Sequence, residues 1–330
     1  MSAALRNSVE PLSIVLSFTI GSIINRRRGD SHFYERANAQ EGGKGGITTS
    51  YWNSGGQNEK SRNTFWSLLG RFFNKFPFLI EIWYWNLSYW VYQLLRAISA
   101  RMIAGNQAIF ERAQGHALQV LRAEQYLGIA IEQPFQQYVL TQYPWLMSIL
   151  AKIYYSHITV GVCFLVYMFK YVPAPIYQRV RRTIAMNNAI AFVIITVWRC
   201  YPPRLLPREY GFVDILHSAA TSATAANVWN NNRFQLTIAA MPSLHFGTSL
   251  YLAVCICRFS PHRMLRILAP LWPTAMLITI VATANHFLTD AMVGALIPLL
   301  GWRWSHVFLR LLPLQERLFA PIARNLPKTD

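Results

Sequence analysis

Apolar runs separated by short polar or basic stretches dominate the pattern of this chain. The runs that we predict to be membrane-spanning helices cover residues 76–98, 144–169, 184–198, 242–257, 268–284 and 286–304. A transmembrane helix needs about 20 predominantly apolar residues. The pattern therefore predicts an all-α fold, a multi-pass membrane helical bundle of about six transmembrane helices.

A shorter apolar run, Leu12–Ile24, precedes these spans and is followed by Asn25-Arg-Arg-Arg28. Because no small-residue cleavage pattern follows it, we expect a short membrane segment or an interfacial helix rather than a signal peptide. Residues 25–63 are polar and rich in glycine, which predicts a flexible cytosolic loop. The chain then divides into an N-terminal apolar segment with a polar loop (1–75), a membrane-embedded domain (76–313) and a C-terminal tail (314–330).

Two polar features interrupt the first part of the membrane domain. Glu81 lies inside the first predicted span, where a carboxylate is costly in hydrocarbon, so we expect it near the headgroups or facing another helix. Residues 101–138 mix charged and apolar positions at a partly helical period, which predicts an amphipathic helix at the membrane interface. We expect His116 on the polar face of that helix.

Composition supports a membrane protein and argues against nucleic-acid binding. The chain is 53% hydrophobic and only 14% charged, whereas soluble domains carry about 25% charged residues. Its net charge of +17 arises largely from basic residues between apolar runs, as the positive-inside bias predicts. The four cysteines lack zinc-ligand spacing, so we expect neither a structural metal nor a disulfide framework.

The short basic loops also predict an orientation. We expect the loops at 170–182 and 258–266 to be cytosolic. The span ends at 198, 242 and 284–286 then share the opposite, luminal or extracytoplasmic face. The polar residues nearest to these ends are therefore predicted to form one site.

Those residues suit the chemistry of phosphate esters. A carboxylate at Asp290 that accepts a hydrogen bond from His286 would leave the other ring nitrogen free to attack phosphorus. His245 is the candidate general acid. The candidate phosphate ligands are Ser243, beside a helix N-terminus, and Arg204, in a loop stiffened by prolines.

Each candidate also has a structural alternative. His286 and Asp290 are at a common spacing that also suits a helix-capping histidine and a solvated aspartate. Arg204 also suits an arginine that meets lipid headgroups, and Arg199 is an alternative phosphate ligand. Asp214 and His217 lie in the same predicted loop, where they either touch the site or cap the loop.

The combination of these residues resembles the type-2 phosphatidic acid phosphatase superfamily, and within it the branch that includes inositol phosphorylceramide synthase. Pro242-Ser-Leu-His245 is similar to the family motif Pro-Ser-Gly-His, and His286 with Asp290 to the end of Ser-Arg-x5-His-x3-Asp. Arg204 is similar to the arginine of Lys-x6-Arg-Pro. The resemblance covers roughly residues 100–305.

By this resemblance His286 is the nucleophile, Asp290 its orienting group and His245 the general acid, in a six-helix bundle that needs no metal or cofactor. The chain departs from the family at the cations that bind phosphate. Val197 stands where the first motif has lysine, and Thr279-Ile280 where the third has Ser-Arg. The synthase-like branch shows similar losses.

The leading hypothesis is thus an integral-membrane lipid phosphatase or phosphotransferase that acts through a phosphohistidine. Its substrate would be a phosphatidate, sphingolipid or isoprenoid phosphate, and its partners are membrane lipids. The alternatives are an inositol phosphorylceramide synthase-type transferase and a non-catalytic lipid-binding or transport protein. The intact histidines favour an enzyme, whereas the missing cations favour the non-catalytic alternative.

Overall fold

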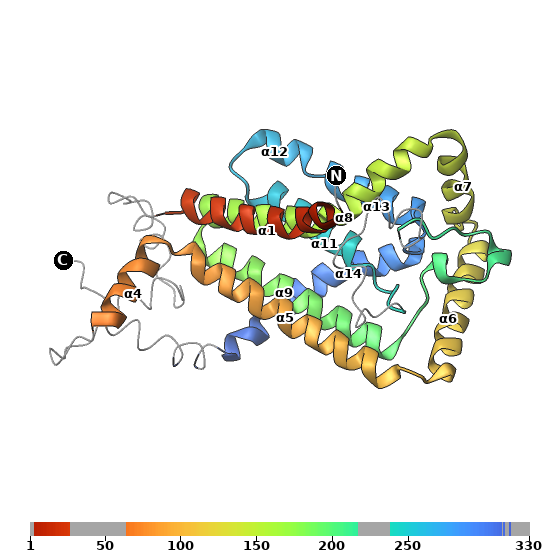
Figure 1. Ribbon diagram of the computed structural model, residues 1–330, viewed down its shortest axis with the longest axis horizontal. Helices are drawn as coiled ribbons and strands as arrows, with labels where there is room; N and C mark the ends of the chain where they lie inside the picture. The colour runs from red at the N-terminus through yellow and green to blue at the C-terminus, as the bar shows by residue number, and fades with distance from the viewer. Residues whose placement is uncertain (1–2, 27–63, 217–237, 312, 314–316, 318–330) are drawn as a thin grey trace.

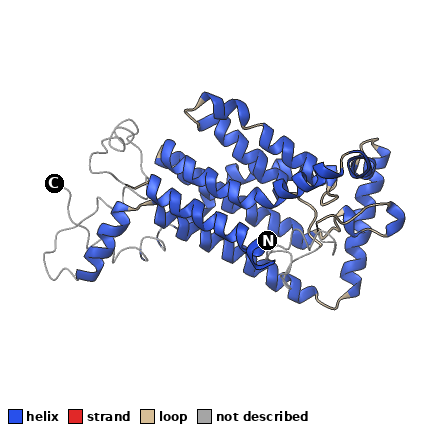
Figure 2. Cartoon of the chain, turned by 45° about the horizontal axis from the view of Figure 1, so that its top comes forward, coloured by secondary structure: helices blue, strands red, loops and turns tan. Residues whose placement is uncertain are grey.

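The computed structural model describes residues 3–26, 64–216 and 238–311, together with residues 313 and 317. These residues form helices and connecting loops, and no strand is drawn among them (Figure 2). The predicted all-α fold is confirmed. Most of the loop expected at 25–63 and the whole of His217 lie outside the described residues.

Long helices lying roughly along one direction form the body of the molecule (Figure 1). Four described stretches are long and apolar enough to cross a membrane, and they comprise α8 (Pro144–Tyr171), α9 (Ala174–Val197), α12 with α13 (Arg263–Leu268 and Leu271–Ala282), and α14 with η3 (Leu288–Trp304 and Ser305–Leu311). The helix α11 (Leu244–Phe259) is apolar but shorter. The chain is therefore a membrane protein built as a helical bundle.

The first predicted span corresponds to α5 (Phe78–Ile103), which packs against α9. Although α5 is 26 residues long, it is not among the stretches apolar enough to cross a membrane by composition. Glu81 is buried and accepts a hydrogen bond from the Tyr177 hydroxyl at 3.1 Å. It also pairs with Arg181 of α9, so this carboxylate faces another helix.

The N-terminal apolar run forms α1 (Ala3–Ile24), which packs lengthwise against α8 (Figure 1). Ile14 and Phe18 are buried in one cluster with Phe78 and Val162. This arrangement fits a membrane segment better than an interfacial helix, the other alternative left open by the sequence. The amphipathic α4 (Thr64–Lys75) precedes α5.

The prediction of a basic loop at 170–182 was wrong. Only two residues separate the end of α8 from the start of α9 at Ala174, and Pro173 and Pro175 suit a helix start. Arg179 lies over the Trp302 ring, 4.0 Å from its centroid. Because Arg179 and Arg181 have partners on neighbouring helices, these side chains can lie within α9 and do not need to be solvated in a loop.

The single amphipathic helix predicted at 101–138 is instead two helices, α6 (Gln107–Tyr126) and α7 (Glu132–Gln142). Gly128 has φ of +70°, a left-handed conformation that ends α6. Both helices lie across one end of the bundle (Figure 1). They cover the N-terminus of α14, because Phe287 is buried against Ala117 and Leu121 of α6.

Candidate functional site

Three connecting segments meet at the end of the bundle that α6 and α7 cover. The segment after α9 is joined to the one before α11 by the Ala240 N–H, which donates to the Cys200 carbonyl at 3.1 Å. The Arg204 N–H donates to the Ala284 carbonyl at 3.0 Å, and the Ser243 N–H to the Asp290 carbonyl at 2.9 Å. The predicted meeting of the span ends at 198, 242 and 284–286 is confirmed.

His286 lies in the turn before α14, whose N-cap is Phe287. His286 therefore lies outside the helix that carries Asp290, although their four-residue spacing would also suit two positions on one helix. The ring is buried, and its Nδ1 lies 2.8 Å from the Ala240 carbonyl oxygen. A carbonyl oxygen only accepts hydrogen bonds, so Nδ1 carries a proton, and in the neutral ring Nε2 is then the nitrogen with the free lone pair.

Asp290 supports His286 from a longer distance than the sequence suggested. Its Oδ2 lies 3.6 Å from His286 Nδ1, beyond a good hydrogen bond, and accepts the Phe287 N–H at 2.9 Å. The carboxyl group is fully buried. The Ala240 carbonyl thus orients the imidazole directly, while the Asp290 carboxyl lies beside it at a longer distance.

His245 is the second residue of α11, and its ring centroid lies 5.8 Å from that of His286. Ser243 is the N-cap of this helix and its Oγ accepts the Phe246 N–H at 3.4 Å. Pro242 immediately precedes the N-cap. The two histidines of the motifs therefore face one another across the start of α11.

Two aromatic residues of α8 join the site, and the sequence did not single them out. The Tyr154 ring stacks on His245 with centroids 4.2 Å apart, and His157 lies 5.1 Å from His245. The His157 Nδ1 is buried and has no hydrogen-bond partner among the described residues. Within an apolar span these residues resemble ordinary core positions, so only the packing of α8 against α11 identifies them.

Arg204 lies beside the turn that carries His286. Its Nε donates to Asn285 Oδ1 at 2.9 Å and its Nη1 to Asp214 Oδ2 at 3.1 Å. Only 9% of the Arg204 side chain is exposed. Asp214 therefore contacts Arg204, the candidate phosphate ligand.

Arg199 is directed elsewhere. Its Nη2 donates to Ser99 Oγ of α5 at 2.9 Å, and no described contact joins it to the histidines of the site. The Arg199 carbonyl oxygen lies 2.7 Å from His116 Nδ1, and the His116 ring stacks on Trp198 with centroids 3.9 Å apart. His116 is therefore a packed residue and not a solvated one on a polar face.

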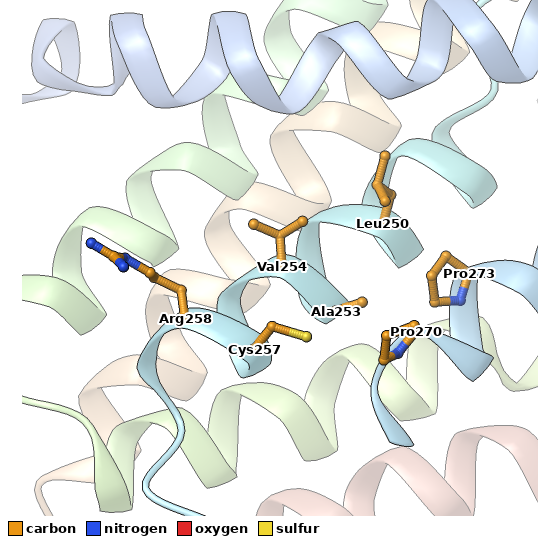
Figure 3. A pocket seen from close by; sticks show the side chains of 7 residues that line it. All are labelled: Leu250, Ala253, Val254, Cys257, Arg258, Pro270 and Pro273. Carbon is orange, nitrogen blue, oxygen red and sulfur yellow. The ribbon is translucent and has the colours of Figure 1, made fainter. Parts of the chain in front are cut away.

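An apolar groove of about 380 Å³ lies elsewhere on α11 (Figure 3). It is lined by α11 residues between Leu250 and Arg258 and by Pro270 and Pro273. The lining begins more than one turn beyond His245 and includes none of the residues above. This groove is therefore separate from the candidate active site.

Comparison with protein families gives one match. The model of the family described as the PAP2 superfamily matches residues 118–304, which is more than half of the chain. The matched region runs from α6 to the end of α14 and contains every residue of the site described above. No curated protein and no solved structure matches the chain.

Proposed function

The chain belongs to the PAP2 superfamily, and we propose that it cleaves a lipid phosphoester through a phosphohistidine formed on His286. Members of this superfamily are generally phosphatases or phosphotransferases. The observation that carries the proposal is the hydrogen bond of His286 Nδ1 to the Ala240 carbonyl oxygen at 2.8 Å. It leaves Nε2 as a nucleophile facing the second histidine of the site.

In the first step, Nε2 of His286 attacks phosphorus and the bond to the leaving oxygen breaks. His245 gives a proton to that oxygen. The imidazole becomes positively charged as the nitrogen–phosphorus bond forms. The Ala240 carbonyl and the buried Asp290 carboxylate, 3.6 Å from Nδ1, stabilise that charge.

In the second step, His245 accepts a proton from the incoming acceptor, whose oxygen attacks phosphorus. The nitrogen–phosphorus bond then breaks and His286 returns to its starting state. Water as acceptor gives a phosphatase, and an alcohol gives a phosphotransferase. Tyr154, stacked on His245 at 4.2 Å between centroids, holds the ring that moves both protons.

Phosphate oxygens would be bound by Arg204 and by the start of α11. The guanidinium of Arg204 is held beside the His286 turn by Asn285 and Asp214, and its planar fork suits the oxygens of a phosphate. Ser243 and the N-terminal N–H groups of α11 offer further donors. Arg199 would need to leave Ser99 before it could contribute.

The finer proposal is transfer to a lipid alcohol, as in inositol phosphorylceramide synthase. This proposal is supported by Val197 and Ile280, which stand where the family motifs have a lysine and an arginine that bind phosphate. The synthase-like branch lacks similar cations. Hydrolysis of a phosphatidate or an isoprenoid phosphate uses the same first step. The acceptor therefore distinguishes the two reactions.

We also propose that the site faces the lumen or the cell exterior. The opposite end of the bundle, where the Tyr167 hydroxyl lies 2.7 Å from His262 Nδ1, carries Lys170, Arg258 and Arg263 at short connections. Basic residues at short connections favour the cytosolic side. Reaction of cysteines introduced at each end with an impermeant reagent in intact cells tests this orientation.

The test of the proposed activity is phosphate release from lipid phosphates by the purified full-length protein in EDTA. The panel contains phosphatidate, a sphingoid-base phosphate and an isoprenyl diphosphate. A parallel assay supplies phosphatidylinositol and ceramide and measures transfer of the headgroup. We expect one of these reactions in the wild type and no reaction with His286→Ala.

The matched control is His306→Ala, because His306 is exposed in η3, which follows the far end of α14. Turnover that persists in His286→Ala would overturn the phosphohistidine. An absence of all reactions from folded wild-type protein would replace the enzyme with the non-catalytic lipid-binding alternative.

A further inference from the structure

Two buried carboxyl groups from other helices reach the N-terminus of α14. Glu124 of α6 is 0% exposed and Glu132 of α7 is 1% exposed. The Leu288 N–H donates to Glu132 Oε1 at 2.7 Å. The Thr289 N–H and hydroxyl donate to Glu124 Oε1 at 2.7 and 2.8 Å.

Together with Asp290, these groups complete the cap of α14. The first N–H groups of a helix have no partner inside it and favour nearby negative charge. Here the N–H of Phe287 donates to Asp290, that of Leu288 to Glu132 and that of Thr289 to Glu124. The cap therefore joins three helices immediately after His286.

Three adjacent buried carboxylates would repel one another if all were charged. Burial, together with the neighbouring Glu132 and against the hydrogen bonds from Thr289, raises the pKa of Glu124 to about 8. Glu124 Oε2 is buried and has no hydrogen-bond partner among the described residues. With a pKa near 8, Glu124 is largely protonated at neutral pH.

We propose that Glu124 and Glu132 form a carboxyl pair that positions His286 and Asp290 for reaction by clamping the start of α14 to α6 and α7. The inference rests on the proposed function. Both glutamates are positioning residues, because they contact the α14 backbone and not the reacting atoms. His286 lies two residues before Leu288, and Asp290 one residue after Thr289, so movement of this turn moves both.

A pair that shares one proton gives the clamp a pH dependence. Glu124 is faced by Glu132 from α7 and by the Cys200 thiol from the segment after α9, and the same thiol also faces Asp290. His286 lies beside Asp290. Loss of the Glu124 proton above its pKa places a second negative charge beside Glu132, which weakens the clamp.

The sign of this effect on stability follows from the direction of the shift. The pKa of Glu124 is higher in the folded protein than the ordinary carboxyl value, so the folded state holds the proton more tightly. The contribution of this group to the free energy of unfolding is therefore complete at acid pH. It declines as the pH rises from the ordinary value towards about 8.

The experiment compares Glu124→Gln and Glu124→Ala in the full-length protein. Glutamine keeps an acceptor for Thr289 and replaces the shared proton with an amide donor, so we expect near wild-type kcat without the decline at alkaline pH. Alanine removes the acceptor, so we expect kcat to fall about 10-fold or more with little change in KM. Glu111→Ala, at an exposed position of the same helix, should behave as the wild type.

Hydrogen exchange of the α14 amides provides a readout that does not depend on activity. We expect the Leu288 and Thr289 amides to exchange faster in Glu124→Ala than in Glu124→Gln, Glu111→Ala or the wild type. Unchanged exchange and kcat in Glu124→Ala would overturn the clamp. Equal loss of kcat in both Glu124 variants would contradict a proton shared between Glu124 and Glu132.

If the wild type is inactive while hydrogen exchange responds as expected, the positioning role of the two glutamates is supported and the proposed enzymatic function is rejected.

Discussion

Gly247 of α11 and Gly294 of α14 lie backbone against backbone where the two helices cross. A Cβ atom on Gly247 would overlap the Gly294 carbonyl oxygen, and one on Gly294 would overlap the Ser243 carbonyl oxygen. Small residues allow helices in membranes to approach this closely. His245 is two residues from Gly247, so this crossing sets the separation of His245 from the His286 turn.

Gly247→Ala is therefore expected to reduce catalysis although alanine favours helices. The added methyl group forces α11 and α14 apart, at a cost of about 1–3 kcal/mol for overpacking. We expect kcat to fall by about 10-fold or more, since small misplacements of reacting groups are costly. Turnover of the active lipid phosphate by the purified variant measures the effect.

The matched control is Gly161→Ala in α8, where an added Cβ meets nothing within 4 Å. This variant should be as active and as stable as the wild type. Equal activity of Gly247→Ala and Gly161→Ala would show that the crossing does not position the histidines.

Arg204→Lys tests the cation of the site. The guanidinium donates to Asn285 and Asp214 through separate nitrogens, an arrangement that a single ammonium group does not reproduce. We expect KM for the lipid phosphate to rise about 10-fold. Initial rates over a range of substrate concentrations separate this effect from a change in kcat.

Arg208→Lys is the control, because Arg208 is exposed in the same connecting segment. Asp214→Asn keeps an oxygen acceptor and should have a smaller effect than Arg204→Lys. A normal KM for Arg204→Lys would exclude Arg204 as a phosphate ligand.

Tyr154 is expected to act through its ring and not through its hydroxyl. The ring stacks on His245 with centroids 4.2 Å apart, and such contacts contribute about 0.5–1.5 kcal/mol beyond burial. Tyr154→Phe should keep nearly full kcat, whereas Tyr154→Leu should lose about 3- to 10-fold. Equal loss in both variants would instead assign a role to the hydroxyl.

The ion pair between Glu81 and Arg181 is expected to matter for stability and not for chemistry. Glu81 is 4% exposed and also accepts the Tyr177 hydroxyl, so Glu81→Gln leaves Arg181 without its charge partner. Breaking a buried pair costs about 3–5 kcal/mol. Thermal unfolding in detergent should show a lower Tm.

The double variant Glu81→Gln, Arg181→Met removes both charges and should recover part of the lost stability. Activity below the melting temperature should stay near that of the wild type in both variants. An unchanged Tm for Glu81→Gln would mean that water or lipid replaces the pair.

Several features could be predicted from the sequence because each depends on local composition. Apolar runs identify the helices that lie in the membrane, because the free energy of transferring a segment from lipid to water depends on the composition of that segment alone. His245, His286 and Asp290 follow from motif order. The meeting of the three span ends followed from alternating the spans across the bilayer, and the hydrogen bonds of Ala240 and Arg204 confirm it.

Other features depend on residues that are far apart in the chain. The partner of His286 Nδ1 is a backbone carbonyl at Ala240, which no side-chain pattern marks. The carboxyl groups of Glu124 and Glu132 resembled the polar face of an interfacial helix, and Tyr154 resembled a core position. Gly105 and Gly128 adopt positive φ angles at helix ends, within the stretch 101–138 that the sequence pattern predicted to be a single helix.

The sequence by itself thus determined that this is an all-α membrane protein with two histidine motifs at one end of its bundle. Only the tertiary structure decided which groups surround those histidines. The physical reason is that hydropathy records whether a residue leaves water, whereas the choice of neighbour depends on how helices cross and which buried polar atoms must find partners.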